Sequence, residues 1–232
     1  MNRTIGTIVL GYDPRQPWHR SQIRHFIVPP APPPAASTKP NGTDRPPMPA
    51  PQFTRETVVD RLLGAFRRYG YDAASLGQLS SATGLGRSSL YHYFPGGKED
   101  MARAVFDHVD DWARDAIFAP IHASGPPEQR LRQVIGVLDE FYDGGAKACF
   151  YGNLVVGDAG VLFKDRLSAS LRKLIEGFAR LAKEKGVSER EAQQRGEDAV
   201  VRIQGALIVA RGLGDPAPFR RVLKRLPNDL LG

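Results

Sequence analysis

Apolar residues from Thr54 onward recur with the 3.6-residue period of an α-helix, and glycines and prolines divide them into separate segments. Thr54 occupies the position of an N-cap, with Phe53 and Val58 spaced around it for a hydrophobic staple. Gly70 stands where the end of a helix favours glycine. The pattern predicts a first helix with an apolar stripe made of Val58, Val59, Leu62, Leu63, Phe66 and Tyr69.

Two further segments follow at short distance and predict a helix–turn–helix. Ser75 and Gln78 have the spacing of a capping box, so we expect a helix to begin there. The glycine-rich stretch 84–86 then allows the sharp corner between two helices. Residues 87–94 form the third segment, which is too short to be a stable helix without support from its neighbours.

The third segment combines a small core face with a surface of hydrogen-bond donors. Leu90 and Phe94, four residues apart, are expected to face the core. Phosphate oxygens and purine acceptor edges need donors of the kind left on the remaining surface. A polar surface helix without a function is the alternative interpretation. The donors are Arg87, Ser88, Ser89, Tyr91, His92 and Tyr93.

The rest of the chain continues the helical period, so the sequence predicts an all-α fold. Residues 98–118 predict a long amphipathic helix, whose stripe contains Met101, Val105, His108 and Trp112. His108 either lies in the core or at its boundary or touches a ligand. Later helices are expected over residues 126–141, 162–185, 188–212 and 216–226, the last of them closed by Pro227.

Small residues in the last part of the chain allow close helix approach. Gly205, Ala206 and Ala210 lie within the segment 188–212. We therefore expect this segment and 216–226 to pair with their copies in a homodimer, with intrachain packing as the alternative.

Composition sets the first 52 residues apart. Ten of the twenty-three residues from 29 to 51 are proline, which predicts a disordered, extended tail. A plain linker or tail is the favoured interpretation, and a basic arm that touches DNA or a ligand for a proline-binding partner is less favoured. Alternatively, Met48 is the true start and the residues before it are not translated. The net charge is +4 for residues 1–52 and +3 for residues 53–98, so the remaining chain is neutral. Positive charge thus gathers at the end that carries the helix–turn–helix.

The sequence gives little support for a disulfide-rich protein, a zinc finger, a membrane protein or an enzyme. Cys149 is the single cysteine, which excludes an internal disulfide or a zinc finger and suits a reducing cytoplasm. No apolar run is long enough for a membrane span. Neither a phosphate-binding glycine loop nor a nucleophile elbow nor a metal-site spacing occurs, so we expect neither an enzyme nor a bound metal or cofactor.

Aromatic residues in the second half could line a mostly apolar pocket for a small apolar or amphipathic effector. Asn153 would be a polar handle in it, although each of these residues could equally be plain core. A redox role for Cys149 is less favoured than a buried, inert thiol. The pocket candidates are His108, Trp112, Phe141, Cys149, Phe150, Asn153 and Phe178.

Residues 54–118 resemble the DNA-binding domain of the tetracycline-repressor (TetR) family of bacterial regulators. The resemblance rests on YGYDA after the first helix, LGQL in the second, the GLG turn, and LYHYFP with a following KE in the third and fourth. A double glycine before Lys98 and the segment CFYGNL are similar to the multidrug-responsive subgroup of the lincomycin-resistance type. Val155-Val156-Gly157-Asp158 departs from that pattern.

The resemblance implies roles for individual residues. The base-reading positions would be Arg87, Ser88, Ser89 and His92, with Arg87 suited to guanine because its planar fork can bind O6 and N7 together. The positions implied for phosphate contacts are Thr54, Arg55, Tyr91, Tyr93 and Lys98.

These observations predict three parts: a tail (1–52), a helix–turn–helix domain (53–98) with a linking helix (98–118), and a helical effector-binding and dimerisation domain (119–232). Two such domains in a homodimer would read a palindromic operator on double-stranded DNA, and an inducer would release a repressor of this kind. A DNA-binding or nucleoid-associated module without ligand control is the alternative.

Overall fold

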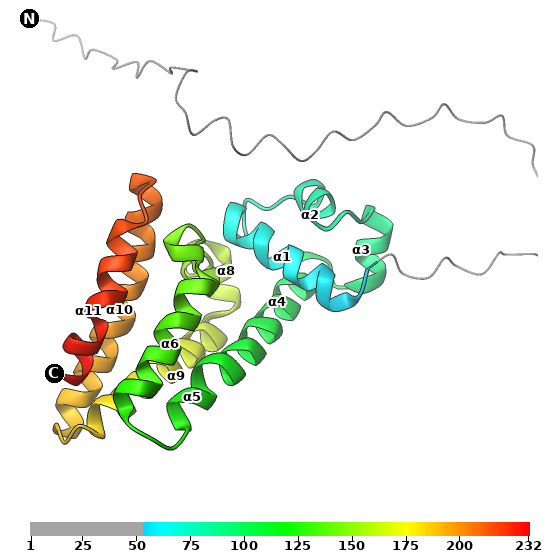
Figure 1. Ribbon diagram of the computed structural model, residues 1–232. Coiled ribbons are helices and arrows are strands. Elements are labelled where there is room, and N and C mark those ends of the chain that lie inside the picture. The colour runs from blue at the N-terminus through cyan, green and yellow to red at the C-terminus, as the bar shows by residue number, and fades with distance from the viewer. Residues whose placement is uncertain (1–52) are drawn as a thin grey trace, which may run out of the picture. The chain divides into compact units, whose positions relative to one another are not determined.

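The computed structural model describes residues 53–232, and all its elements are helical, as the sequence predicts (Figure 1). The predicted tail and the alternative start at Met48 lie outside the described residues. The helices in chain order are α1 (Arg55–Tyr69), α2 (Leu76–Thr83), α3 (Arg87–Tyr93), α4 (Lys98–Ala113), α5 (Ala119–His122), α6 (Pro127–Phe141), α7 (Phe150–Leu154), α8 (Asp158–Leu162), α9 (Lys164–Lys183), α10 (Glu189–Leu213) and α11 (Ala217–Leu231).

Local capping fixes the starts of the first two helices, as predicted. The hydroxyl of Thr54 accepts a hydrogen bond from the backbone N–H of Thr57 at 3.2 Å. Ser75 and Gln78 form a reciprocal capping box, with Ser75 N–H donating to Oε1 of Gln78 at 2.9 Å. Each bond satisfies an amide that the first helical turn leaves without a partner.

The fourth helix continues farther than the predicted end at residue 118. After α4 the chain makes a π-helical turn, η2 (Arg114–Phe118), and enters α5 without a break. A short 3₁₀ turn, η3 (Asp143–Gly145), follows α6. The predicted helix 162–185 is shorter at its start, because Phe163 leaves the helical conformation and separates α8 from α9. Phe163 is buried against Tyr71 and Phe106, and this packing holds the corner.

The prediction that Pro227 closes the last helix is wrong. Helix α11 runs through Pro227 to Leu231. Leu230 and Leu231 are buried in the core, so packing outweighs the backbone hydrogen bond that proline cannot make. In addition, Nη1 of Arg195 donates to the carbonyl groups of Leu230 at 3.1 Å and Gly232 at 2.6 Å.

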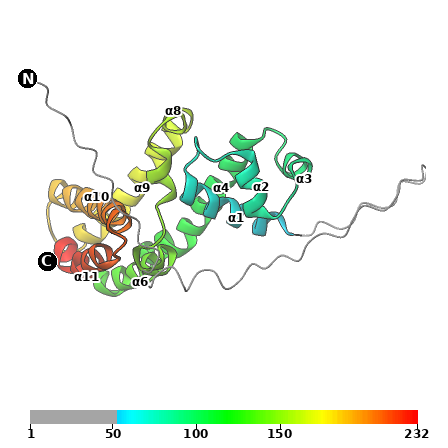
Figure 2. The ribbon, with the colours of Figure 1, turned by 90° about the horizontal axis from the view of Figure 1, so that it is seen from above.

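One continuous apolar core runs through the described residues, and large phenylalanines occupy it from α1 to α11. Both ribbon views place α3 at the opposite end of this part of the chain from α10 and α11, which pack side by side (Figures 1 and 2). Between residues 53 and 232, none of the helices combines the length and the apolar character that a membrane span requires. The fully buried phenylalanines are Phe66, Phe94, Phe106, Phe150, Phe178 and Phe219.

Candidate nucleic-acid interface and central cavity

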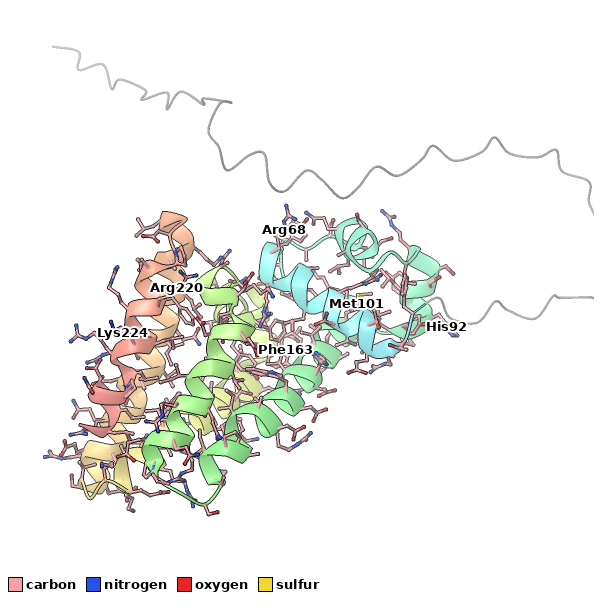
Figure 3. The ribbon with its side chains drawn as sticks, in the orientation of Figure 1. Arg68, His92, Met101, Phe163, Arg220 and Lys224 are labelled. Carbon is pink, nitrogen blue, oxygen red and sulfur yellow. The ribbon has the colours of Figure 1, made fainter. Side chains whose placement is uncertain are left out.

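Helix α3 is anchored by its apolar side and exposes its polar side. Leu90 and Phe94 are fully buried, which confirms the predicted core face. Tyr91 is 44% exposed, and His92 points outward from the helix (Figure 3). Within residues 53–232, the exposed side chains of this helix make no hydrogen bond. They are Arg87, Ser88, Ser89, Tyr91 and His92.

The turn between α2 and α3 is held by side chains as well as by glycine. Gly84 adopts the left-handed conformation, with φ of 72°. Ser80 donates its hydroxyl proton to the carbonyl group of Leu85 at 2.5 Å. Arg61 of α1 donates to the carbonyl group of Thr83 at 2.7 Å, and its guanidinium lies 4.0 Å from the ring of Phe53. Arg61 therefore helps to fix the turn.

The residues proposed for phosphate contacts differ in their exposure and in whether they already make hydrogen bonds within the protein. Thr54 and Arg55 are exposed at the start of α1. Tyr93 is half-buried, and its hydroxyl donates to the carbonyl group of Phe53 at 2.9 Å. Lys98 is also half-buried, with Nζ 3.3 Å from the carbonyl oxygen of Asp72. Tyr93 and Lys98 would have to exchange these internal bonds to reach DNA.

A cavity of about 700 Å³ lies among α4, η2, α6, α7, α9 and α10. This volume falls in the range of small-molecule sites, which are mostly apolar with a few polar groups. Trp112 of α4 and Phe141 of α6 stack at 3.6 Å between ring centroids and form part of the wall. The aromatic residues that line it are Trp112, Phe118, Phe141, Tyr142, Phe150, Tyr151 and Phe178.

Three polar groups of the cavity wall bond to one another. Tyr151 donates to Oδ1 of Asp110 at 2.7 Å, and Ser170 donates to the same oxygen at 3.2 Å. Arg166 holds the other carboxylate oxygen at 2.9 Å. Burial and the bond to Asp110 raise the pKa of Tyr151, so its hydroxyl remains protonated as a donor.

A second pair of polar groups lies in the same wall. The hydroxyl of Tyr142 lies 3.5 Å from Sγ of Cys149. Burial raises the pKa of Tyr142 well above its ordinary value. Both side chains are buried, and the wall therefore offers a ligand mainly apolar surface.

Two predicted pocket residues lie away from the cavity, whereas five line it. His108 is half-buried on α4 but is absent from the cavity wall. Asn153 donates through Nδ2 to the carbonyl group of Arg67 at 2.7 Å, so it binds the end of α1 instead of a ligand. The predicted pocket residues that line this cavity are Trp112, Phe141, Cys149, Phe150 and Phe178.

Arg67 connects α1 to the cavity wall. Its side chain is buried, with the residue only 9% exposed. Its guanidinium lies 4.0 Å from the ring centroid of Phe141, and Nη1 lies 3.5 Å from the carbonyl oxygen of the same residue. The helix bundle that carries α3 thus touches the wall of the cavity directly.

Known proteins resemble this chain in sequence. Residues 60–105 match the family model described as "Bacterial regulatory proteins, tetR family". The uncharacterized HTH-type transcriptional regulator YxaF of Bacillus subtilis is 24% identical over 75% of this chain and 93% of its own length. The HTH-type transcriptional repressor LfrR of Mycolicibacterium smegmatis is 33% identical over 37% of this chain and 44% of its own length.

Solved structures share the fold. A TetR transcriptional regulator from Legionella pneumophila superposes with a TM-score of 0.65 at 19% identity, over 77% of this chain and 98% of that one. A cysteine mutant of the regulator CifR, complexed with 26bp double-strand operator DNA, gives a TM-score of 0.60 at 19% identity, over 78% of this chain and 98% of that one.

Proposed function

We propose that this chain, a TetR-family DNA-binding transcriptional regulator, is a repressor that a small apolar or amphipathic molecule releases from a near-palindromic operator. The observation that carries the proposal is the exposed side of α3, whose donors have no hydrogen bond within residues 53–232. Arg87, Ser88, Ser89 and His92 read base edges, and Thr54, Arg55 and Tyr91 contact phosphates. The protein acts in the cytoplasm, where it meets chromosomal DNA.

Selection from random double-stranded DNA tests the DNA-binding part. We expect a near-palindrome whose half-sites lie about one helical turn apart, or a multiple of it, because two α3 helices of a dimer enter successive major grooves. Binding without sequence preference, together with a steep salt dependence, would instead support a nucleoid-associated module.

The cavity supports control by a ligand. Trp112 belongs both to the cavity wall and to α4, the helix that begins directly after α3. A molecule bound there favours one position of α4 over another and so competes with the operator through one conformational equilibrium. The test is a thermal-shift screen of amphipathic compounds, followed by operator affinity at saturation with the best stabiliser. Equal affinities with and without the compound would remove this mechanism.

The exposed side of α10 supports a homodimer through α10 and α11. Val201 and Ile208 are 63% and 69% exposed, and Gly205 between them has open space above it. Spacings of four and three residues place all three on one stripe. By light scattering, Ile208→Glu should turn a dimer into a monomer. Val161→Glu, a change at a 79% exposed apolar residue of α8, should leave the dimer intact. A dimeric Ile208→Glu protein would contradict the proposed interface.

A further inference from the structure

A second hollow, of about 390 Å³, lies between α1, the segment 146–148 and α10. We call it the basic hollow. Four of its residues carry positive charge, and Asp60 carries the single negative charge. Arg68 marks its side on α1 (Figure 3). The basic hollow is lined by Asp60, Leu63, Gly64, Arg67, Arg68, Ala146, Lys147, Ala148 and Arg211.

The cations of the basic hollow lack carboxylate partners. Arg68, Lys147 and Arg211 are exposed, and no carboxylate of the described part of the chain comes within ion-pair distance of any of them. Surface cations of this kind attract anions weakly when they stand alone, because water screens them. Three of them around one hollow, with a fourth charge at its base, produce a stronger local potential.

The fourth charge is the buried guanidinium of Arg67. Its Nε and Nη2 atoms have no hydrogen-bond partner among residues 53–232, and Nη1 makes only the 3.5 Å contact to Phe141. Burial lowers the pKa of Arg67, yet arginine remains charged in proteins. Buried charges are ordinarily paired, because an unpaired one is strongly destabilising. A positive charge that water does not screen thus lies at the base of the hollow.

We propose that the basic hollow binds a small oxyanion, namely the phosphate or carboxylate group of a metabolite. Lys147 and Arg211 donate to it from the rim, and Arg67 attracts it from the base. The volume of about 390 Å³ leaves room for the rest of a metabolite beside the anionic group. The basic hollow shares none of its lining residues with the central cavity, and the two are linked where Arg67 stacks on Phe141.

Calorimetric titration of the full chain with inorganic phosphate and, separately, with citrate tests the site, in chloride at matched ionic strength. We expect saturable binding of at least one of the two anions. Phosphate alone would assign a phosphate group, citrate alone a carboxylate, and both an oxyanion in general. Binding of neither overturns the proposal, and it does so without bearing on operator binding.

Charge variants identify the place of binding. A Lys147→Gln/Arg211→Gln protein should bind at least tenfold more weakly, because two charge-assisted hydrogen bonds are lost. The matched control is Arg132→Gln/Arg172→Gln, which removes two exposed charges outside the hollow and should bind like the parent. Equal weakening in both proteins would show attraction to a basic protein in general and would overturn the site.

A steric variant separates shape from charge. Gly64 lines the hollow, and a Cβ atom there would meet nothing within 4 Å. Gly64→Met therefore fills the hollow, keeps every charge and favours the helix. We expect its anion binding to disappear while its thermal stability is retained. Parent-like binding by Gly64→Met would place the anion elsewhere and would contradict the proposal.

Discussion

The exposed side of α3 and the wall of the central cavity both carry polar side chains, but the two regions use them differently. On α3, Arg87 and its neighbours have no hydrogen bond within residues 53–232. In the cavity, Tyr151 and Ser170 both donate to Asp110. Unpaired donors give α3 a surface that discriminates by hydrogen bonds. In the cavity, Tyr151, Ser170 and Asp110 already bond to one another, so a ligand meets these three groups mainly through shape and apolar contact.

The largest effect is expected on the side of α3 that has no contact with solvent. Leu90→Ala should lower the free energy of unfolding by about 2–5 kcal/mol, since it leaves a cavity under a helix of seven residues. Urea unfolding measures this loss. Ser89→Ala, at an exposed position of the same helix, should stay within about 0.5 kcal/mol of the parent. Equal losses would mean that the two sides of α3 do not differ.

The next effect concerns the free donors themselves. Arg87→Ala should weaken operator binding by about 1–3 kcal/mol and relax the preference at one base pair, because a bidentate contact to guanine is lost. Affinities for operators with each base pair replaced in turn measure both effects. Arg132→Ala should change neither. A uniform loss across all operators would make Arg87 a phosphate contact instead.

The paired groups of the cavity should appear in the pH dependence of stability. Tyr142 and Tyr151 have raised pKa values in the folded protein, through burial and, for Tyr151, the bond to Asp110. Above about pH 10 they ionise only in the unfolded chain, so stability falls with rising pH by about 1.4 kcal/mol per unit for each tyrosine. Below that pH both states are neutral, and these groups contribute no slope.

Urea unfolding between pH 9 and 11.5 checks this expectation. Tyr142→Phe and Tyr151→Phe should each make stability fall less steeply with pH, by the contribution of the tyrosine that was removed. A slope unchanged from the parent's in both variants would contradict the raised pKa values of the two cavity tyrosines.

The smallest effect is expected at Tyr93, which lies on α3 but has a paired hydroxyl, as the polar groups in the cavity do. Tyr93 lies on α3, but its hydroxyl is paired with the carbonyl group of Phe53. Tyr93→Phe should cost about 0.5–1.5 kcal/mol of stability and leave the preferred operator sequence unchanged. Stability and sequence preference are measured side by side. A changed preference would place Tyr93 among the base-reading residues.

The parts of the fold that depend on near neighbours in sequence could be predicted. The caps at Thr54 and Ser75 are confirmed, because they involve residues only three positions apart. The burial of Leu90 and Phe94 is confirmed because the period of the short helix already separates them from the polar residues.

Contacts between distant segments could not be predicted. Arg67 meets Phe141, which is 74 residues later, and Asn153 meets the carbonyl group of Arg67, which is 86 residues earlier. No local pattern marks an arginine that will be covered by a later segment. The path of α11 through Pro227 likewise depends on burial of Leu230, which the local rule for proline does not include.

Because of the π-helical turn at Arg114–Phe118, the number of residues in this segment decides which side chains face the core. Val105, Val109, Ala113, Ile117 and Ile121 recur every four residues, and none is more than 7% exposed. In a regular α-helix each such step drifts by about 40°, so the stripe would leave the core within a few turns. The wider turn takes up this drift. Deleting one residue, such as Ala116, would convert the π-helical turn to a regular α-helical turn and leave the drift of about 40° per step uncompensated. In this segment the number of residues therefore matters to the fold as much as their apolar character does.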